Sequence, residues 1–518
     1  MNKDFCLLDE PWLPVRLTDG GIAEVGLLDV FRRSGEIAAL AETAPPHLVA
    51  QYRLLLAIVH RALGHAMPQG WKDKDRAGWY RDGLPVDAIL AYLEQWRERF
   101  WLFHPEYPCM QVAALATAEE TRDKRKPWTQ IALASANGNT PVVFDHACDD
   151  SPKPITPAVA IGTLLGFLQF TPGGLVKTLR DADKAGPLVN TAAAIPVGAT
   201  LAQTLALCLH PAPGRRAQDD LPAWERPPLT LAALRGEPVL ATGPNDRYTR
   251  QSRAVLLLRE ADGCVRWLRF GAGFALGEDP HAPDPMASFR AGTNGLVRLT
   301  FGEGRALWRD LPALVPNPSG DSQAAAVVGH AIALHAQLAP FEAVHQPLLV
   351  AGLASDQAKL LRWRSEQIAL PVALLEQAEK ALYLRALVDR ADALFGDLRG
   401  LATRMLAETL PDSASKDARS RARALLDAGP LAASYFAAAE RSLAGLLDAL
   451  GEGDFEQAGS QWNAVLRRSA QGAWGRVVTG LGHSPRALRA DAKFRSRFQG
   501  LLNKHAPVPR ASTVTTEE

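Results

Sequence analysis

Hydrophobic and polar positions alternate in two different ways along this chain. Up to about residue 368, short apolar runs are broken by Gly, Pro and Asp, a pattern typical of short strands and turns. Only a few stretches there show the three-and-four spacing of a helix, namely 46–64, 86–100 and 157–170. After Pro371 the helical spacing dominates, in the stretches 371–411, 417–428, 431–450, 454–468 and 485–504.

These patterns predict an α+β chain of two domains. Residues 1–368 should form a large mixed α/β domain, and residues 369–506 an antiparallel four-helix bundle, because short loops join long amphipathic helices. The remaining residues, 507–518, are expected to be a disordered tail.

The stretch from Pro347 to Gln367 carries the clearest candidate chemistry. An apolar run, 348–350, is expected to turn at Gly352 into a small polar loop, 354–358. The chain then leaves as a segment that contains Lys359, Arg362, Trp363 and Arg364. A polar tip beside cations and an aromatic ring suits insertion of one side chain into a nucleic acid, while the cations hold phosphates. An ordinary loop between a strand and a helix is the competing interpretation.

Two further features allow the same kind of contact. Gly173 and Gly174 follow a predicted helix, and adjacent glycines let a backbone approach a ligand closely; a helix C-cap and turn is the alternative. Between 248 and 298 an aromatic residue and cations interleave along predicted strands, as on a phosphate-facing sheet edge or on a solvated edge. These residues are Tyr248, Arg250, Arg253, Arg266, Arg269 and Arg298.

Charge is balanced overall but not locally. The chain has 57 Lys and Arg against 56 Asp and Glu, so bulk charge predicts no partner. Between Gln461 and Arg510, however, ten cations face a single acid, Asp491. Those on the last predicted helix include Arg486, Arg489, Lys493 and Arg497. Such clustering indicates either a polyanion-binding face, which we favour, or a solvated surface.

Cysteine content and the N-terminal sequence argue against disulfide-rich, zinc-binding, secreted and membrane-spanning proteins. The five cysteines are widely spaced with no CxxC pair, which argues against a disulfide scaffold and a structural zinc site and favours a reducing cytoplasm. No signal peptide and no membrane-spanning stretch is expected. We also expect no cofactor and no small-molecule substrate.

Catalytic motifs are missing from the sequence. It contains no GxxxxGK[ST], no HExxH and no GxSxG. The best alternative is a metal-dependent nuclease centred on His104, Asp145 and His146, because imidazoles and carboxylates can hold a metal for hydrolysis. His60 and His65 are interpreted as structural or surface histidines.

An ordered set of stretches resembles one family, the large subunit (CasA) of the type I-E CRISPR surveillance complex, Cascade. The similar stretches are LLDEPWLPVRLTDG at the N-terminus, HPEYPCMQ (104–111), NTPVVFDH (139–146), TPGGL (171–175), RYTRQSRAVLL (247–257), DPMASFR (284–290), RALWRDL (305–311) and LASDQAKLL (353–361). The resemblance spans the whole chain and ends in the helical region.

The resemblance implies a non-catalytic subunit that recognises the protospacer-adjacent motif (PAM) in double-stranded DNA, starts strand separation and helps recruit the helicase-nuclease. Its implied partners are guide RNA, target DNA, the other Cascade subunits and that helicase-nuclease. It implies cytoplasmic localisation, no membrane contact and no metal, since only Cys264 remains of the cysteine cluster of some members.

Residue by residue, the resemblance implies a glycine loop against the PAM minor groove at Gly173 and Gly174. It implies a glutamine wedge at Gln357, flanked by Asp356 and Ala358, where Asp356 replaces an asparagine of the family. A lysine finger of the family has no lysine here; Arg269 is the best match and Arg266 the alternative. The loop that reaches guide RNA and backbone subunits corresponds to 139–150, with Asn139, Phe144 and His146 as its contact residues.

Overall fold

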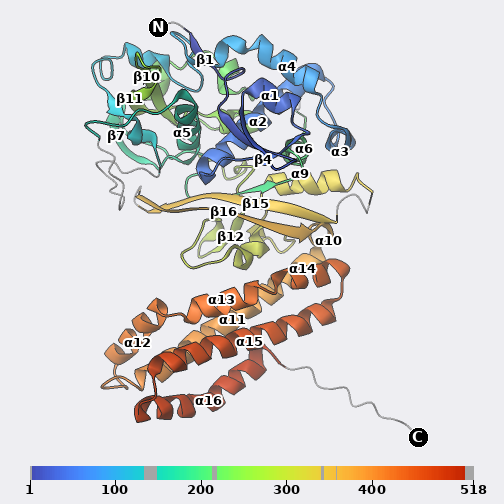
Figure 1. Ribbon diagram of the computed structural model, residues 1–518, viewed down its shortest axis with the longest axis vertical. Helices are drawn as coiled ribbons and strands as arrows, with labels where there is room; N and C mark the ends of the chain where they lie inside the picture. The colour runs from blue at the N-terminus through green and yellow to red at the C-terminus, as the bar shows by residue number, and fades with distance from the viewer. Residues whose placement is uncertain (1–2, 134–148, 213–218, 340–343, 357–358, 508–518) are drawn as a thin grey trace. The chain divides into compact units, whose positions relative to one another are not determined.

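The computed structural model of the protein describes residues 3–133, 149–212, 219–339, 344–356 and 359–507. These residues form two compact units (Figure 1). The first contains residues 1–301 and 321–369, and the second contains residues 302–320 and 370–518. The segment 302–320 therefore belongs with the C-terminal helices, although it precedes the last strands of the first unit in sequence.

The first unit combines small sheets with helices. Its strands are ordered β1-β5, β3-β2-β4, β7-β8, β10-β11-β6, β13-β12-β14 and β16-β15-β9. The strand bounds are β1 Asp4–Cys6, β2 Leu13–Leu17, β3 Ile22–Val25, β4 Ile37–Leu40, β5 Trp101–Phe103, β6 Lys126–Pro127, β7 Gly174–Thr178, β8 Arg180–Asp183, β9 Ala192–Pro196, β10 Arg253–Arg259, β11 Val265–Ala272, β12 Phe289–Gly292, β13 Gly295–Arg298, β14 Ser322–Gln323, β15 His345–Asp356 and β16 Lys359–Pro371.

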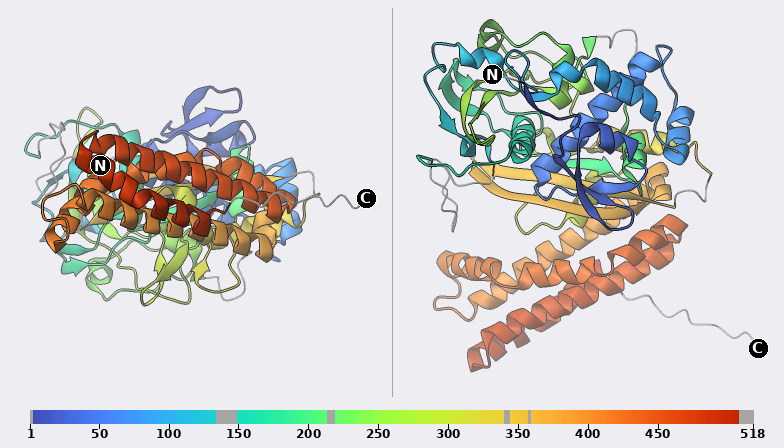
Figure 2. Two further views of the ribbon diagram at one scale, coloured as in Figure 1. Left: turned by 90° about the horizontal axis from the view of Figure 1, so that it is seen from below. Right: turned by 45° about the horizontal axis from the view of Figure 1, so that its top comes forward.

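Helix α2 (Pro45–Ala66) lies at the centre of this unit, next to α5 (Figures 1 and 2). Two prolines start it, which suits the first helical turn, and almost every side chain up to Leu63 is buried. Inside the core, Arg53 forms an ion pair with Asp284 at 2.9 Å, so its charge is matched where water is excluded. The other helices of the unit are α1 Leu27–Arg32, α3 Asp73–Asp82, α4 Val86–Gln95, α5 Pro157–Phe170, α6 Leu201–Cys208, α7 Leu231–Arg235, α8 Pro244–Thr249 and α9 Ala326–His335.

The second unit is helical, with α10 Val372–Glu376, α11 Ala378–Ala407, α12 Lys416–Ala428, α13 Leu431–Glu440, α14 Leu443–Glu452, α15 Phe455–Leu481 and α16 Pro485–His505. Ser415, Asp454 and Ser484 cap α12, α15 and α16 by accepting a backbone N–H. The helices α11, α15 and α16 are long, and α13 with α14 packs along α15 in the place of a fourth helix. The predicted α+β class with C-terminal helices is confirmed.

Four predicted helices differ from those observed. The stretch 86–100 ends as an α-helix at Gln95, and the stretch 371–411 is divided into α10 and α11 at Gln377, whose backbone is extended. The stretch 431–450 is divided into α13 and α14 by a turn at Arg441 and Ser442, where Ser442 N–H bonds to Ala439 O. The stretch 454–468 continues to Leu481, because Trp474 and Val477 extend the buried stripe past several glycines of low helix propensity. None of the helices in the described ranges combines the length and the apolar character that crossing a membrane requires.

Candidate nucleic-acid interface

The glycine pair begins a short β-hairpin. Helix α5 ends with Thr171 as its C-cap, so the interpretation of Gly173 and Gly174 as that cap is wrong. Gly174 opens β7 with a φ of +139°, and a Cβ added there would meet no atom within 4 Å, so this backbone faces open space. Leu175 beside it is 75% exposed. The hairpin therefore offers a bare backbone with room for a bulky ligand.

The base of this hairpin is held by a buried carboxylate. Asp183, at the end of β8, forms an ion pair with Arg180 at 2.5 Å and another with Arg253 at 3.1 Å. Its second oxygen also accepts the backbone N–H of Gly273 at 2.7 Å. Arg180 in turn donates to the carbonyls of Gly236 and Gly273, both at 2.8 Å. The exposed glycine backbone is thus fixed to the rest of the unit by charged groups that satisfy one another.

Strand β11 passes under the hairpin and carries Arg269. Residues two apart on a strand share a face, so Arg269 lies on the face of Gly271, where an added Cβ would be 3.1 Å from Leu179 of the hairpin. The Nη1 of Arg269 donates to the carbonyl of Ala116 at 3.0 Å and, at longer range, to those of Leu115 and Thr121. The structure therefore brings the glycine hairpin and Arg269 to one face. Backbone carbonyl groups fix the orientation of the Arg269 side chain.

The alternative to Arg269 is already engaged elsewhere. Arg266 points to the other face of β11 and forms ion pairs with Glu260 and Asp262. A guanidinium with two carboxylates beside it has little charge left for a phosphate. Between the two candidates, Arg269 is the one that shares a face with the hairpin.

The polar stretch after 348 is not arranged as expected. The predicted turn at Gly352 is wrong, because β15 continues through it to Asp356. From Leu348 to Gly352 the strand pairs with β9, and an added Cβ at Gly352 would lie 2.1 Å from Thr191 O. Glycine is needed here for close approach of two backbones, not for a turn. The competing interpretation, an ordinary loop between a strand and a helix, is also wrong, since β16 returns beside β15 as a strand.

The expected wedge falls between these two strands. Asp356 is the last residue of β15 and Lys359 the first of β16, and the two strands are neighbours in their sheet. Gln357 and Ala358 lie outside the described residues. On β16, Trp363 is 36% exposed, and Arg364 lies over the ring of Phe301 at 5.2 Å.

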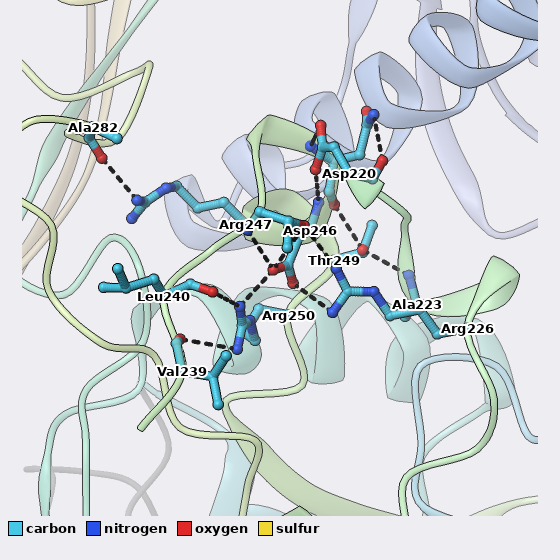
Figure 3. A network of polar contacts seen from close by, with 12 residues as sticks. Asp220, Ala223, Arg226, Val239, Leu240, Asp246, Arg247, Thr249, Arg250 and Ala282 are labelled. Atoms are coloured by element: carbon cyan, nitrogen blue, oxygen red, sulfur yellow. Dashed lines mark hydrogen bonds and ion pairs between the residues drawn. The ribbon is translucent and has the colours of Figure 1, made fainter. Parts of the chain in front are cut away.

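The interpretation of the arginines at 250 and 253 as a phosphate-facing sheet edge is wrong. Arg250 and Arg253 are only 2% and 3% exposed. Figure 3 shows Arg250 and Arg226 converging on Asp246, at 2.5 and 3.2 Å, with Arg250 also donating to the carbonyls of Val239 and Leu240. Asp220 accepts the backbone N–H groups that start α8. This network stabilises the core around α8. With Arg250 engaged here and Arg253 paired with Asp183, neither of these two arginines is available for a ligand.

The basic residues of α16 are partly neutralised within the chain. Lys493 forms an ion pair with Glu408 at 2.7 Å, and Arg486 donates to the carbonyl of the same residue at 3.1 Å. Arg489 donates only to the carbonyl of Pro485, one turn back, and Arg497 lies 5.6 Å from the ring of Phe494. The α16 face that the sequence indicated is therefore less cationic than its composition suggests.

Comparison with known proteins decides the family. The family model for CRISPR-associated protein Cse1 matches residues 7–473. The chain belongs to the Cse1 family. A CasA/Cse1 protein of Thermus thermophilus is 34% identical over 517 residues, which cover 97% of this chain and 98% of that protein. The family identification from sequence motifs is therefore confirmed.

Solved structures of Cse1 proteins share the fold. The structure of Thermus thermophilus CasA (Cse1) superimposes with a TM-score of 0.83 at 32% identity, covering 97% of this chain and 100% of that one. Cse1 from Acidimicrobium ferrooxidans gives a TM-score of 0.77 at 24% identity, covering 98% and 100%. A chain of a CRISPR RNA-guided surveillance complex gives 0.72 at 24%, covering 96% and 100%. The last two likenesses concern the fold alone.

In this member of the Cse1 family, His104 is the one residue of the nuclease alternative that lies among the described residues, and it has a structural role. His104 is buried, and its Nδ1 accepts the backbone N–H groups of Glu106 and Tyr107 at 3.1 and 2.8 Å. The Nδ1 atom of His104 therefore stabilises the turn that follows it and is not available to a metal ion. Asp145 and His146, together with Asn139 and Phe144 of the expected guide-RNA loop, lie outside the described residues. Within the described ranges, no group of three or more His, Cys, Asp or Glu could hold a metal ion.

His60, in contrast, is part of a buried cluster. Its Nδ1 lies 2.9 Å from the side-chain nitrogen of Asn245 and its Nε2 lies 3.0 Å from the carbonyl of Pro211. Its ring packs edge-on against Trp71, and His210 lies 6.1 Å away. Burial lowers the pKa of His60 from 6.5 to about 4.

This burial makes stability depend on pH. Between pH 6.5 and 4 the unfolded chain binds a proton at His60 that the folded chain does not, so the free energy of unfolding falls as the pH drops. The loss from this residue should be about 2 kcal/mol at pH 5. Urea unfolding at pH 7.5 and 5 measures the difference, which His60→Gln should reduce by about that amount. His281→Gln, at an exposed position, is the control; if both variants keep the parental difference, His60 does not cause it.

Sequence reasoning missed two features. Asp183 lies three residues after Arg180, but its other partner, Arg253, comes from β10, so the sequence around Asp183 gives no sign that the carboxylate is buried between two arginines. Arg468 and Arg476 belong to the cationic cluster, but their position on a groove was not anticipated. Their spacing of eight residues, with Gly472 midway, was the available sign that they share one helix face.

Proposed function

We propose that this chain is a non-catalytic subunit of a guide-RNA surveillance complex, which recognises the PAM in double-stranded DNA and starts strand separation beside it. The observation that carries the proposal is an exposed, anchored glycine hairpin that shares a face with Arg269, in a chain of the Cse1 family. A fold relative described as part of a CRISPR RNA-guided surveillance complex supports the assembly. The proposal places PAM recognition in residues 1–368 and a supporting role in 369–506.

In this proposal the hairpin lies against the minor groove of the PAM. With no side chain at Gly173 or Gly174, backbone groups can approach the base edges, while Arg269 supplies a cation. The minor groove mainly separates A·T from G·C pairs, so recognition by these groups tolerates several motifs. Sequence specificity then passes to pairing with the guide, which the protein need not read.

Strand separation is assigned to Gln357 with Asp356 and Ala358, between the ends of β15 and β16. Two adjacent strands give such a tip a firm support, because β15 is also paired with β9. Each base step costs about 1.4 kcal/mol on average to open, and an inserted side chain offsets part of one step.

Two further sets of contacts belong to the proposal. The loop with Asn139, Phe144 and His146 contacts guide RNA and backbone subunits. Displaced DNA is contacted by the α16 residues Arg486, Arg489, Lys493 and Arg497. Recruitment of the helicase-nuclease completes the role.

The experiment that tests this uses the complex reconstituted with its guide and partner subunits. Two duplex targets share the protospacer and differ only in the adjacent motif. We expect strong discrimination, lost when Gly173 and Gly174 are both replaced by Leu. Gln357→Ala should weaken binding to the closed duplex by about tenfold, as a loss of about 1.4 kcal/mol predicts, and leave a pre-opened target unaffected.

Gln323→Ala is the matched control, because Gln323 is an exposed glutamine at the end of a short strand of the same unit. Gln323→Ala should keep both the discrimination between adjacent motifs and the parental binding to the closed duplex. Tight binding without discrimination by the parent complex would contradict PAM recognition. Equal losses of Gln357→Ala on closed and pre-opened targets would contradict the wedge.

A further inference from the structure

A groove of about 610 Å³ lies between α13 and α15 in the helical unit. Its floor is made of small residues, including Ala433 and Ala437 on α13 and Gly472 on α15. A Cβ added at Gly472 would meet no atom within 4 Å, so the space above it is open. The groove exists because two neighbouring helices both present small side chains where they face it.

Three guanidinium groups stand along this groove. Arg441, at the end of α13, and Arg468 and Arg476 on α15 are all exposed. No Asp or Glu is among the described residues that line the groove, and no ion pair involves any of these arginines in the part of the chain that the structure describes. This differs from the α16 face, where Lys493 is paired with Glu408. The three arginines of the groove therefore have no paired carboxylate among the described residues.

The other polar groups of the groove are hydroxyls. Ser434, Ser442 and Ser469 line it; the Oγ of Ser434 is buried without a hydrogen-bond partner, and Ser469 is 4% exposed. Arginine guanidinium and serine hydroxyl groups are the donors that typically contact phosphate oxygens. No aromatic ring is among the described residues that line the groove, so its contacts favour phosphate over base stacking on aromatic side chains.

The dimensions suit one strand rather than a single ion. Arg468 and Arg476 are eight residues apart on α15, which at 1.5 Å per residue separates them by about 12 Å along the axis. Successive phosphates of a stacked strand advance by about 3.4 Å along its axis, so the two arginines are separated by about three to four such steps. A floor of small residues keeps the strand within reach of both cations.

We propose that the groove between α13 and α15 binds the sugar-phosphate backbone of a single DNA strand, independently of its sequence. This inference rests on the proposed function, since strand separation at the PAM is what would supply a single strand. It adds Arg441, Arg468 and Arg476 to the α16 residues that the proposed function assigns to displaced DNA.

Fluorescence anisotropy of the full chain with labelled oligothymidine, over a series of salt concentrations, tests the charges. The double variant Arg468→Gln with Arg476→Gln should bind about tenfold more weakly, and its salt slope should fall by about 1.4, from two lost phosphate contacts. The matched double variant Arg419→Gln with Arg421→Gln, at two exposed positions of α12 that do not line the groove, should change both quantities much less. The opposite ranking, or no change in either variant, overturns the assignment.

A second pair of variants tests the groove without altering charge. Gly472→Gln places a side chain on the groove floor and should weaken oligothymidine binding several-fold. Gly475→Gln is the control, because Gly475 is an exposed glycine of the same helix with equally open space and does not line the groove. Equal effects of the two variants would mean that long-range charge, and not this groove, holds the strand. Both variants should remain folded, since glutamine favours helix over glycine.

A labelled polyglutamate peptide distinguishes the other class of partner. If it binds to the parent with the same dependence on Arg468 and Arg476 while oligothymidine does not bind, the groove takes an acidic protein segment and the proposal is overturned. PAM discrimination by the reconstituted complex is measured in parallel on the same variants. A parent complex that does not discriminate contradicts the proposed function, whereas oligothymidine binding by the full chain still decides the groove.

Discussion

Asp183→Asn is expected to lower the free energy of unfolding by about 3 kcal/mol, because it leaves two buried guanidinium groups without their counter-charge. Arg180 and Arg253 both pair with this carboxylate, and its side chain is fully buried. The neutral amide also cannot accept the four donors that the carboxylate oxygens accept now, namely Arg180, Arg253 and the backbone N–H groups of Lys184 and Gly273. The hairpin of β7 and β8 should loosen first, since Asp183 is its last residue. Urea unfolding gives the free energy, and hydrogen exchange shows whether β7 and β8 lose protection.

The matched control lies on the same strand. Asp181 is exposed, so Asp181→Asn changes the net charge equally without touching the anchor, and it should alter stability by less than about 0.5 kcal/mol. If both variants lose the same stability, the effect comes from net charge and the role of the buried carboxylate is refuted. In the reconstituted complex, Asp183→Asn should also reduce PAM discrimination, because the glycine backbone is no longer held in place.

Gly352→Ala is expected to cost about 3 kcal/mol or more, because the added methyl group would lie 2.1 Å from the carbonyl oxygen of Thr191. The atom that it meets is backbone, which cannot rotate away. Strand β15 must therefore separate from β9, and its pairing from Leu348 to Gly352 should weaken. Thermal and urea unfolding measure the loss, and binding of a closed duplex by the complex shows whether the end of β15 is still presented.

Gly329→Ala provides the comparison within the same unit. Gly329 lies in α9, where an added Cβ meets nothing within 4 Å, so alanine should stabilise the helix by about 0.5 to 1 kcal/mol. A neutral result for Gly352→Ala would show that β15 can shift without cost, contrary to the close backbone contact described above.

Long periodic segments were predictable from the sequence, and contacts between distant segments were not. The stretches 46–64 and 157–170 correspond to α2 and α5 within two residues at each end, because a helix depends on local spacing and start signals. Gly352 shows the opposite case. The residue suggested a turn, but it is required by the backbone of Thr191, which lies far away in sequence.

The arginines show why the candidate site was harder to predict than the fold. Arg250, Arg253, Arg266 and Arg269 look alike in sequence, yet two are buried in ion-pair networks, one is neutralised by neighbouring acids, and one is held by carbonyl groups beside the glycine hairpin. Their availability depends on which carboxylates the fold brings to them. The family motifs located the hairpin and β11 because they encode such long-range arrangements indirectly.

The anchored hairpin also has a consequence for how such a protein can diversify. Asp183 pairs with Gly174 at the base of the hairpin and is joined there by Arg253, whereas Leu179 at its turn packs against a buried cluster and the side chains of Leu175 and Lys177 are exposed. Exposed positions whose side chains contribute little to the core can be exchanged between relatives at small cost to folding. Grafting 174–178 from another Cse1 protein, with Leu179 and the anchor kept, is therefore a direct route to a chimera of altered motif preference.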